Sequence, residues 1–331
     1  MRMGIASPSS EAELWAWSVW FARALWLAGA AACLLAADLP FVGIEALRRI
    51  SHYGKLRSEV AVVADSGAFL RLQTRLAKLS LPPRTVWTAY YAGGAALNTV
   101  CLVWEPCLLL SLLQVHLLRR VYETGFVTLF SETRREHPLT VCVGVFFYAL
   151  LSPSLALEVR AARLQSVHLH DQHVRELEVD ASGTATWFAM ATIAAFLGAN
   201  VAQHLAHVEL ARLRASGNLP LKIQAGSKAQ YGVPTGWLFT HLSCCPHYTC
   251  EIVLYVALAL LAATDAAGPV GGAGVTIWYG GYNMRACVCG WGAVLFSTIN
   301  LSITAVRTRR WYRKRPEARH LSRWAIIPLV L

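Results

Sequence analysis

The sequence predicts an all-α polytopic membrane protein with seven transmembrane helices. Of its 331 residues, 56% are hydrophobic and only 15% are charged, and the mean hydropathy is +0.43. A soluble domain carries about 25% charged residues, so the composition favours a membrane protein over a soluble one. Long apolar segments and an uneven distribution of basic residues between them complete the prediction.

Each predicted crossing is an apolar segment of about 20 residues, the length an α-helix needs to cross a hydrocarbon core of roughly 30 Å. Pro153 interrupts the fourth segment, which is therefore the least regular. Glu11 and Glu13 precede the first segment where a cleavable signal would be basic, so we expect this segment to remain as a membrane span. The predicted spans are 13–37, 85–104, 106–130, 139–157, 184–206, 247–264 and 284–306.

Lys and Arg outnumber Asp and Glu by 30 to 19, and the net charge of +11 is concentrated in particular loops. Basic residues gather after the first span, at Arg134 and Arg135, in 207–246 and in the tail, whereas 265–282 contains none. Basic loops stay on the cytosolic side. We therefore expect 207–246 and the C-terminus in the cytosol and the N-terminus on the other side. This distribution explains the charge without a nucleic-acid partner, and we expect none.

The chain shows no internal repeat and no linker long enough to separate two domains, so we expect one integral membrane domain over 1–331. Nine cysteines are scattered, mostly within or beside the apolar segments. Free cysteine packs as a small hydrophobic residue, and an odd number of cysteines in membrane helices is not typical of a disulfide framework.

One short segment, HLSCCPHYTCE at 241–251, has the composition of a metal site. Zinc sites usually combine a C-x2-4-C pair with a second pair of ligands, but these cysteines fall on different faces of any helix and no second pair is present. We therefore expect no metal, although a site in which His204 or His116 joins His247 and Glu251 stays an alternative. Histidines also occur in the insertion 158–183, where the neighbouring acidic residues better fit a solvated loop or surface helix: His168, His170 and His173.

Polar side chains recur at the predicted cytosolic ends of four spans. Burying such groups in a membrane is costly, so they usually face the interior of a bundle and often mark function. Residues three or four positions apart share one face of a helix. We therefore expect these ends to line one cavity that opens to the cytosol. The residues are His116, Arg119, Arg120 and Glu123 of the third span, Asn200, Gln203, His204 and His207 of the fifth, His247 and Glu251 of the sixth, and Asn300 of the seventh.

Two stretches in the C-terminal half resemble the steroid 5-alpha-reductase family. The stretch YGVPTGWLFTHLSCCPHYTCEIVLY at 231–255 is similar to the family signature, in which a Pro-Gly turn and an aromatic stretch precede an Asn/His-x3-Glu element that opens a helix. The tail from residue 309 is similar to the family's terminal segment. Three further motifs resemble the branch that reduces polyprenols or polyprenals: HLLRR with the acidic Glu123 after it, YGK at 53–55 and PPRTVWTAYY at 82–91.

The resemblance implies an enzyme of the endoplasmic-reticulum membrane that uses NADPH to reduce a carbon–carbon double bond. The bond would be that of the α-isoprene unit of polyprenol or polyprenal, in dolichol biosynthesis, which supports protein N-glycosylation. Residues 1–180 would then form the side that meets the lipid substrate, and 181–331 the NADPH-binding region around the cytosolic cavity. The implied partners are the polyprenoid substrate and membrane lipids, with no obligate protein partner.

The resemblance also assigns individual residues. Two positions that contact the steroid carbonyl in steroid-reducing members differ, since this chain has Tyr91 in place of a glutamate and Leu117, beside His116, in place of a tyrosine. These differences argue against a steroid substrate. The cofactor-binding residues that it implies are Arg120, Asn200, His204, Arg214, Tyr231, His247, Glu251, Asn300 and Tyr312.

The chemistry of the reaction adds its own constraints. Hydride addition needs a double bond conjugated with a carbonyl, whose oxygen requires a hydrogen-bond donor while an acid protonates carbon. This requirement favours a polyprenal over the allylic polyprenol, which stays an alternative. The catalytic candidates are Tyr90, Tyr91 and His116, and we expect Tyr90 or His116 nearest the oxygen.

The phosphates of NADPH require cations, and the available side chains are Arg120, Arg214 and Arg309. No GxGxxG motif follows a predicted strand, so a Rossmann domain is excluded as the site of the cofactor. We therefore expect the cofactor to lie between helices.

Three other classes compete with this interpretation. One is a 3-oxo-steroid 5-alpha-reductase. Another is an isoprenylcysteine-type membrane methyltransferase, which would favour an Arg-His-Pro-x-Tyr element, whereas CCPHYTCE has Pro, His and Tyr in another order. The last is a transporter or structural membrane protein, but transporters usually have repeats and broken helices in both halves, and neither is visible.

Overall fold

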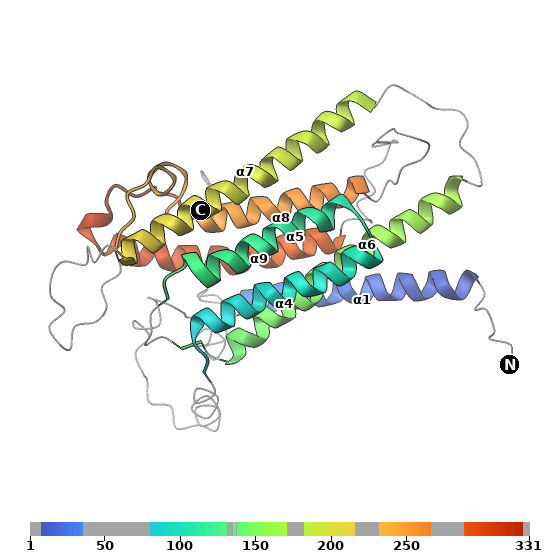
Figure 1. The fold of residues 1–331 in the computed structure, drawn as a ribbon, viewed down its shortest axis with the longest axis horizontal. Coiled ribbons are helices and arrows are strands. Elements are labelled where there is room, and N and C mark those ends of the chain that lie inside the picture. Colours follow the sequence, from blue (N-terminus) through green and yellow to red (C-terminus); the bar gives the residue numbers. More distant parts are fainter. Residues whose placement is uncertain are drawn as a thin grey trace.

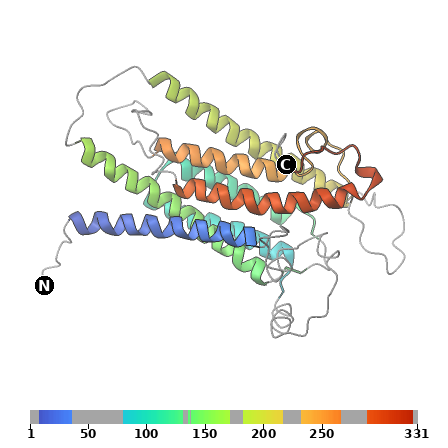
Figure 2. The same ribbon diagram turned by 180° about the vertical axis from the view of Figure 1, so that it is seen from behind.

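The computed structural model describes residues 8–35, 80–130, 135–136, 138–170, 182–215, 232–265 and 288–326. Within these ranges the chain forms a bundle of α-helices that lie side by side along its long axis (Figures 1 and 2). The helices are α1 (Pro8–Leu35), α4 (Pro83–Trp104), α5 (Leu108–Tyr122), α6 (Pro138–His170), α7 (Ser182–Ala215), α8 (Pro246–Asp265) and α9 (Val288–Arg313). Each coincides in position with one predicted span. The described residues form no strand beyond an isolated bridge between Leu81 and Glu136.

Proline opens several of these helices. Pro83, Pro138 and Pro246 are the first residues of α4, α6 and α8. Proline suits the first helical position, because the N–H that it lacks would have no partner within the helix there. Pro153, by contrast, lies inside α6 without ending it, and the helix continues to His170. The predicted interruption of the fourth span at Pro153 is therefore wrong.

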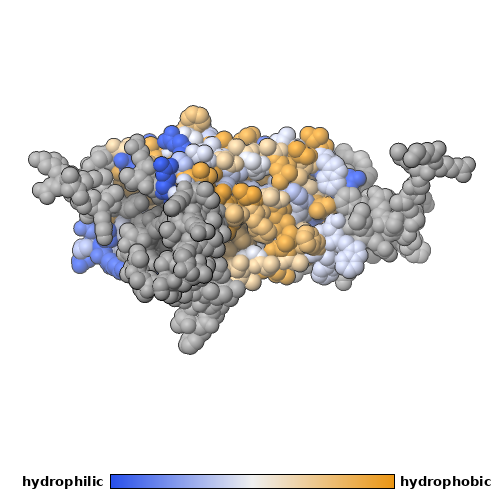
Figure 3. All heavy atoms as spheres, turned by 90° about the horizontal axis from the view of Figure 1, so that it is seen from below, coloured by the Kyte–Doolittle hydropathy of each residue, from blue (hydrophilic) through white to orange (hydrophobic). Residues whose placement is uncertain are grey.

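Several helices have the length and composition of membrane spans. α5 does not, since its 15 residues extend only about 22 Å at 1.5 Å per residue, less than the hydrocarbon core of roughly 30 Å. Hydrophobic side chains cover the middle of the face in Figure 3, and hydrophilic ones gather toward one end. The helices thus support a polytopic membrane protein, while seven crossings stay a prediction. The segments that could cross are Trp17–Leu34, Val141–Ala161, Trp187–Ala215 and Val288–Arg313, with the shorter apolar Pro246–Ala262 in α8.

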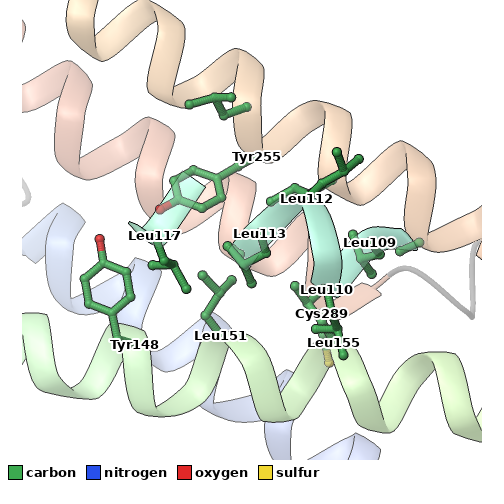
Figure 4. Packing of buried hydrophobic residues seen from close by; sticks show 14 of the residues in the cluster. Leu109, Leu110, Leu112, Leu113, Leu117, Tyr148, Leu151, Leu155, Tyr255 and Cys289 are labelled. Carbon is green, nitrogen blue, oxygen red and sulfur yellow. The ribbon is translucent and has the colours of Figure 1, made fainter. Parts of the chain in front are cut away.

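The helices pack around an apolar interior. Within the described ranges, six helices form a closed ring in which each contacts the next, in the order α1, α6, α4, α5, α8 and α9, and α9 contacts α1 again. The remaining described helix, α7, packs mainly against α8. Leu109, Leu113 and Leu117 recur every four residues and so lie above one another on one face of α5. They are fully buried in the same cluster as Leu151 and Leu155 of α6 (Figure 4).

At the end of the bundle where α9 begins, α6 contributes a buried carboxylate. Oε1 of Glu158 accepts the backbone N–H of Cys289 at 2.7 Å and lies 3.2 Å from Nη2 of Arg23 in α1. A carboxylate is favourable at a helix N-terminus, where the backbone N–H groups have no partner within the helix. Glu158 therefore joins α1, α6 and α9.

Some sequence-based predictions fall on residues outside the described ranges. They concern the basic segment after the first span with its motif 53–55, His173, Tyr231 and most of the loop 265–282. The sides of the membrane assigned to these loops, and the role of Tyr231, stay predictions. His168 and His170 belong to the end of α6.

Candidate active site

Polar side chains of α5, α7 and α8 meet at the end of the bundle opposite Glu158. There α5 continues into the π-helical turn η2 (Glu123–Val127), and the π-helical turn η3 (Leu238–Leu242) precedes α8. The predicted convergence of the third, fifth and sixth spans is therefore present. We define the polar cluster as the residues that hydrogen bonds or ion pairs join here: His116, Arg119, Arg120, Glu123, Asn200, Gln203, His204, His207 and Glu251.

Glu123 is the centre of this cluster. Its side chain is fully buried, and each carboxylate oxygen contacts one arginine and one histidine. Oε1 accepts from Arg119 and lies 2.8 Å from Nδ1 of His204. Oε2 accepts from Arg120 and lies 2.8 Å from Nδ1 of His207. One buried carboxylate thus pairs with two cations and orients two imidazoles, and buried charges require such hydrogen-bonded partners.

Arg119 connects α5 with α7. Its Nε donates to Oδ1 of Asn200 at 2.8 Å, and one terminal nitrogen donates to Oε1 of Gln203. The imidazole of His116 stands beside them, with Nδ1 3.3 Å from Oδ1 of Asn200. The polar faces predicted on the third and fifth spans therefore face each other.

Glu251 extends the cluster into α8. Its carboxylate accepts from Nε2 of Gln203 and from the hydroxyl of Tyr255 at 3.2 Å, and Oε1 lies 3.7 Å from Nε2 of His116. His247, one turn earlier, accepts Nε2 of Gln203 at its backbone carbonyl (3.0 Å), and its ring packs 5.6 Å from that of His207. The predicted His247/Glu251 pair thus joins the polar cluster by a backbone carbonyl and a carboxylate.

Tyr91 of α4 contacts the cluster through Arg120. Nη2 of Arg120 donates to the Tyr91 hydroxyl at 2.9 Å, and the guanidinium lies 4.6 Å from the centre of the ring. Tyr91 itself is buried. Because Arg120 donates to the phenol oxygen, the phenol hydrogen is directed to another acceptor. A buried phenol beside a cation is suited to donate a hydrogen bond to an oxygen that gains negative charge.

Two tyrosines that the sequence did not single out complete the site. Tyr148 of α6 has its ring centre 5.2 Å from that of Tyr91. Tyr255 of α8 donates to Glu251, four residues earlier on the same face. Tyrosine in an apolar span looks like a packing residue, so only the spacing between Glu251 and Tyr255 could have indicated a role.

The other candidate residues lie in different surroundings. Tyr90 is buried against Trp87, 5.5 Å between ring centres, and against α6, where a Cβ at Gly144 would be 2.5 Å from its ring. Arg214 donates to the backbone carbonyl of Leu129 after η2. The carbonyl of Asn300 accepts from Thr304 within α9, at 3.1 Å. The roles predicted for these three residues stay predictions.

A second polar feature forms where the C-terminal segment folds back over the start of α8. The backbone N–H of Cys244 donates to the carbonyl of Trp324 (2.9 Å), and that of Ser322 donates to Phe239 (3.0 Å). The fold-back encloses a pocket of about 230 Å³, which we call the basic pocket. It includes the predicted cofactor residues Arg309 and Tyr312. Its full lining is Cys244, Arg309, Tyr312, Arg313, Arg315, Ala318, Arg319, Leu321, Ser322 and Arg323.

The loop before η3 is fastened to α7 by one carboxylate. Oε1 of Glu209 accepts the backbone N–H groups of Thr235 and Gly236 at 2.9 and 2.7 Å. A Cβ at Gly236 would lie 2.0 Å from the other oxygen of Glu209, so only glycine fits without displacing this carboxylate. The Pro-Gly turn of the signature is thereby held against α7.

A bundle of apolar helices around a buried network of cations, carboxylates and phenols defines an integral membrane protein with a polar site inside its bundle. Residues 136–268 match the family model described as 3-oxo-5-alpha-steroid 4-dehydrogenase. They carry a domain of the steroid 5-alpha-reductase family, which confirms the resemblance predicted from the sequence. This range includes α6, α7 and α8, and with them most of the polar cluster.

Relatives with curated names support the same branch of the family. The chain is 27% identical over 242 residues to polyprenal reductase 1 of Oryza sativa subsp. indica, covering 69% of this chain and 60% of the relative. It is 27% identical over 245 residues to the polyprenal reductase of Xenopus laevis, covering 71% and 65%. For the polyprenal reductase of Caenorhabditis elegans the identity is 28% over 224 residues, covering 68% and 60%. The chain thus spans less than two thirds of the length of these relatives.

Proposed function

We propose that this protein is an NADPH-dependent reductase that saturates the α-isoprene double bond of a polyprenal, in the endoplasmic-reticulum membrane. The reaction would supply dolichol biosynthesis and thereby protein N-glycosylation. The observation that carries the proposal is the buried contact between Tyr91 and Arg120, next to Glu251, in a family of reductases. The names of the relatives support the substrate class.

The surroundings of Tyr91 support a prenyl substrate over a steroid. Leu117 stands where the resemblance places a tyrosine in steroid-reducing members, and it is fully buried among the leucines of the apolar interior. An isoprenoid chain offers only apolar surface beyond its terminal oxygen. The apolar side chain of Leu117 beside the phenols therefore suits an isoprenoid substrate, whose only polar group is its terminal oxygen.

The residues present fit a dinucleotide phosphate. The basic pocket presents five arginines and Tyr312, and arginine binds phosphate oxygens through paired charge-assisted hydrogen bonds. In the polar cluster, Nε2 of His116 and Nε of Arg120 are buried and make no hydrogen bond with the described residues. Buried polar atoms of this kind are usually satisfied, and a bound amide or carbonyl would satisfy them. We assign the phosphates to the basic pocket and the nicotinamide end to the side of Glu251.

NADPH supplies a hydride when it is bound, and the protein residues control the charge that this transfer creates. Addition of hydride to the β carbon moves the electrons of the double bond to the carbonyl oxygen. Tyr91, polarised by Arg120, would donate to that oxygen and stabilise the resulting enolate. Glu123 holds Arg120 in place. Because the network is buried, the donors act away from bulk water, in a medium of low dielectric constant.

The test is a comparison of substrates with purified protein in membranes. Polyprenal, polyprenol and a 3-oxo-4-ene steroid are each incubated with NADPH or NADH, and the products are identified by mass spectrometry. We expect the saturated aldehyde from polyprenal with NADPH. Saturation of the steroid alone would overturn the proposal, as would transfer of a labelled methyl group to a prenylcysteine without nucleotide oxidation.

A further inference from the structure

A second phenol faces the one that the proposed function uses. Tyr148 of α6 is buried, with 9% of its surface exposed, and its ring centre lies 5.2 Å from that of Tyr91 at an angle of 59°. Both phenols are buried. Phe147, its neighbour in the chain, packs against Tyr255 with ring centres 5.5 Å apart and holds this part of α6 against α8.

Tyr255 of α8 also lies near Tyr148 (Figure 4). Figure 4 shows Tyr148 and Tyr255 beside Leu117 at one end of the buried cluster, with the other labelled leucines toward the opposite end. Tyr255 donates its hydrogen to Glu251 at 3.2 Å. Tyr148 thus packs on a phenol held by Arg120 and lies near a phenol held by a carboxylate, where the polar cluster meets the apolar interior.

The hydrogen atoms of these phenols have different roles. The hydrogen of Tyr255 is committed to Glu251. The oxygen of Tyr91 is occupied by Arg120, which leaves its hydrogen for another acceptor. Among the described residues the hydroxyl of Tyr148 makes no hydrogen bond to a charged group, so its hydrogen can turn to a substrate oxygen without breaking such a bond.

An oxyanion is stabilised best by preorganised donors aimed at one point. We propose that Tyr148 is a catalytic residue that donates, together with Tyr91, to the aldehyde oxygen of a polyprenal, and that Tyr255 is the positioning residue behind it. The proposal rests on the proposed function and deepens it. It assigns the oxygen to a pair of phenols from α4 and α6, instead of to Tyr90 or His116.

The step balances as follows. Hydride brings two electrons to the β carbon, and the double-bond pair shifts to form an enolate whose negative charge lies on the oxygen between the two phenols. A proton from water then adds to the α carbon and restores the carbonyl. The sum is one hydride and one proton added across the carbon–carbon double bond. The oxygen of a polyprenol gains no such charge, so two phenols give it no comparable stabilisation, and the pair selects the aldehyde.

The kinetic test replaces Tyr148 with Phe, which keeps the ring and removes only the hydroxyl. We expect kcat for polyprenal to fall by about 100-fold, the lower end for loss of one oxyanion donor, with KM for polyprenal and NADPH changed less than threefold. Tyr122→Phe is the matched control, because Tyr122 lies on α5 with 54% of its surface exposed. Its kcat should equal that of the unaltered protein.

A spectroscopic test needs neither the cofactor nor turnover. A saturated isoprenoid aldehyde with a ¹³C carbonyl is bound to the protein, and its C=O stretch is isolated by isotope-edited infrared spectroscopy. Donors lower this frequency, so Tyr148→Phe should raise it and Tyr122→Phe should not. If the Phe variant does not fold, 3-fluorotyrosine incorporated at position 148 keeps the packing and is a stronger donor, and the band should then move to lower frequency.

The outcomes separate the two proposals. If the unaltered protein reduces polyprenal but Tyr148→Phe keeps kcat within threefold and leaves the band in place, the role of Tyr148 is wrong and the proposed function stands. If the unaltered protein reduces no polyprenal, the proposed function is wrong. An infrared band that responds to position 148 in that case still supports aldehyde binding by Tyr148, and a band that does not respond overturns it.

Discussion

The guanidinium of Arg120 contacts Tyr91 in two ways at once, by a hydrogen bond from Nη2 to the hydroxyl (2.9 Å) and by its position over the ring, 4.6 Å from the centre. The same guanidinium donates to Glu123. A lysine ammonium is a compact charge that lacks the fork needed for both partners. The arrangement at Tyr91 therefore depends on arginine and not on positive charge alone.

Arg120→Lys should consequently impair catalysis more than folding. We expect kcat for polyprenal to fall about tenfold, equivalent to about 1.4 kcal/mol of transition-state stabilisation. The measurement is steady-state kinetics beside thermal denaturation in detergent. Arg84→Lys, at an exposed position of α4, is the control and should change neither. Full activity of Arg120→Lys would show that the orientation of Tyr91 does not matter.

Glu123→Gln should destabilise the protein. The carboxylate is fully buried and faces two arginines and two histidines, so the neutral amide leaves buried cations without their counter-charge. Removing one partner of a buried ion pair costs about 3–5 kcal/mol. Thermal denaturation of the purified variant should show a large loss of stability. An unchanged unfolding temperature would contradict the central position given to Glu123.

Glu251→Gln should weaken cofactor binding and leave the stability of the protein nearly unchanged, in contrast to Glu123→Gln. Glu251 accepts from the neutral Gln203 and Tyr255, and its contact with His116 is long, at 3.7 Å. The amide oxygen of the introduced glutamine can still accept a hydrogen bond from one of these two donors. We expect a weaker affinity for NADPH with little change in unfolding temperature. Nucleotide titration monitored by tryptophan fluorescence provides the measurement, and full NADPH-dependent activity would refute the assignment of the nicotinamide end to Glu251.

Arg309→Gln tests the basic pocket. Loss of one charge-assisted hydrogen bond, worth about 1.5–3 kcal/mol, should raise KM for NADPH by about tenfold or more. The adjacent Arg310→Gln is a matched control, because Arg310 is exposed and does not line the pocket. Equal effects of the two variants would indicate general electrostatic attraction and not a bound phosphate.

Gly236→Ala tests the attachment of the signature loop to α7. The added methyl group would displace the carboxylate of Glu209 and break its bonds to two backbone N–H groups, at a cost of about 1–3 kcal/mol in the free energy of unfolding. In a Glu209→Ala background the same change should cost little, because the obstacle is absent. A double-mutant cycle measures the difference. Additive effects would mean that Glu209 is not the partner that requires glycine.

The sequence predicted the helices well because apolar length is a strong local signal. Every predicted span overlaps one helix of the bundle, and the polar residues at intervals of three and four on the third and fifth spans do face each other. The interruption predicted at Pro153 is absent, since α6 continues through this residue. A proline weakens one turn, and the packing of α6 against α4 supplies enough contact to maintain the rest.

The site was predicted less completely, because it depends on which helices are neighbours. Glu123 was visible as a polar residue, but nothing in the local sequence shows that four side chains converge on it. Tyr148 and Tyr255 could not be told from packing residues without the contacts of α6 and α8. The basic pocket arises because the C-terminal segment folds back and pairs residue 322 with 239 and residue 324 with 244. Such long-range pairing produces no periodic pattern in the sequence.

The buried contact of Glu158 implies an order of assembly. Arg23 precedes Glu158 by 135 residues and Cys289 follows it by 131, so at about 5–20 residues per second of synthesis the carboxylate waits roughly 7 to 26 seconds for the last helix. During that time Arg23 is already made and can neutralise it within the lipid. When α9 is inserted, its first N–H groups meet a carboxylate that is already in position. Arg23 of α1 thus keeps Glu158 paired until α9 binds to it.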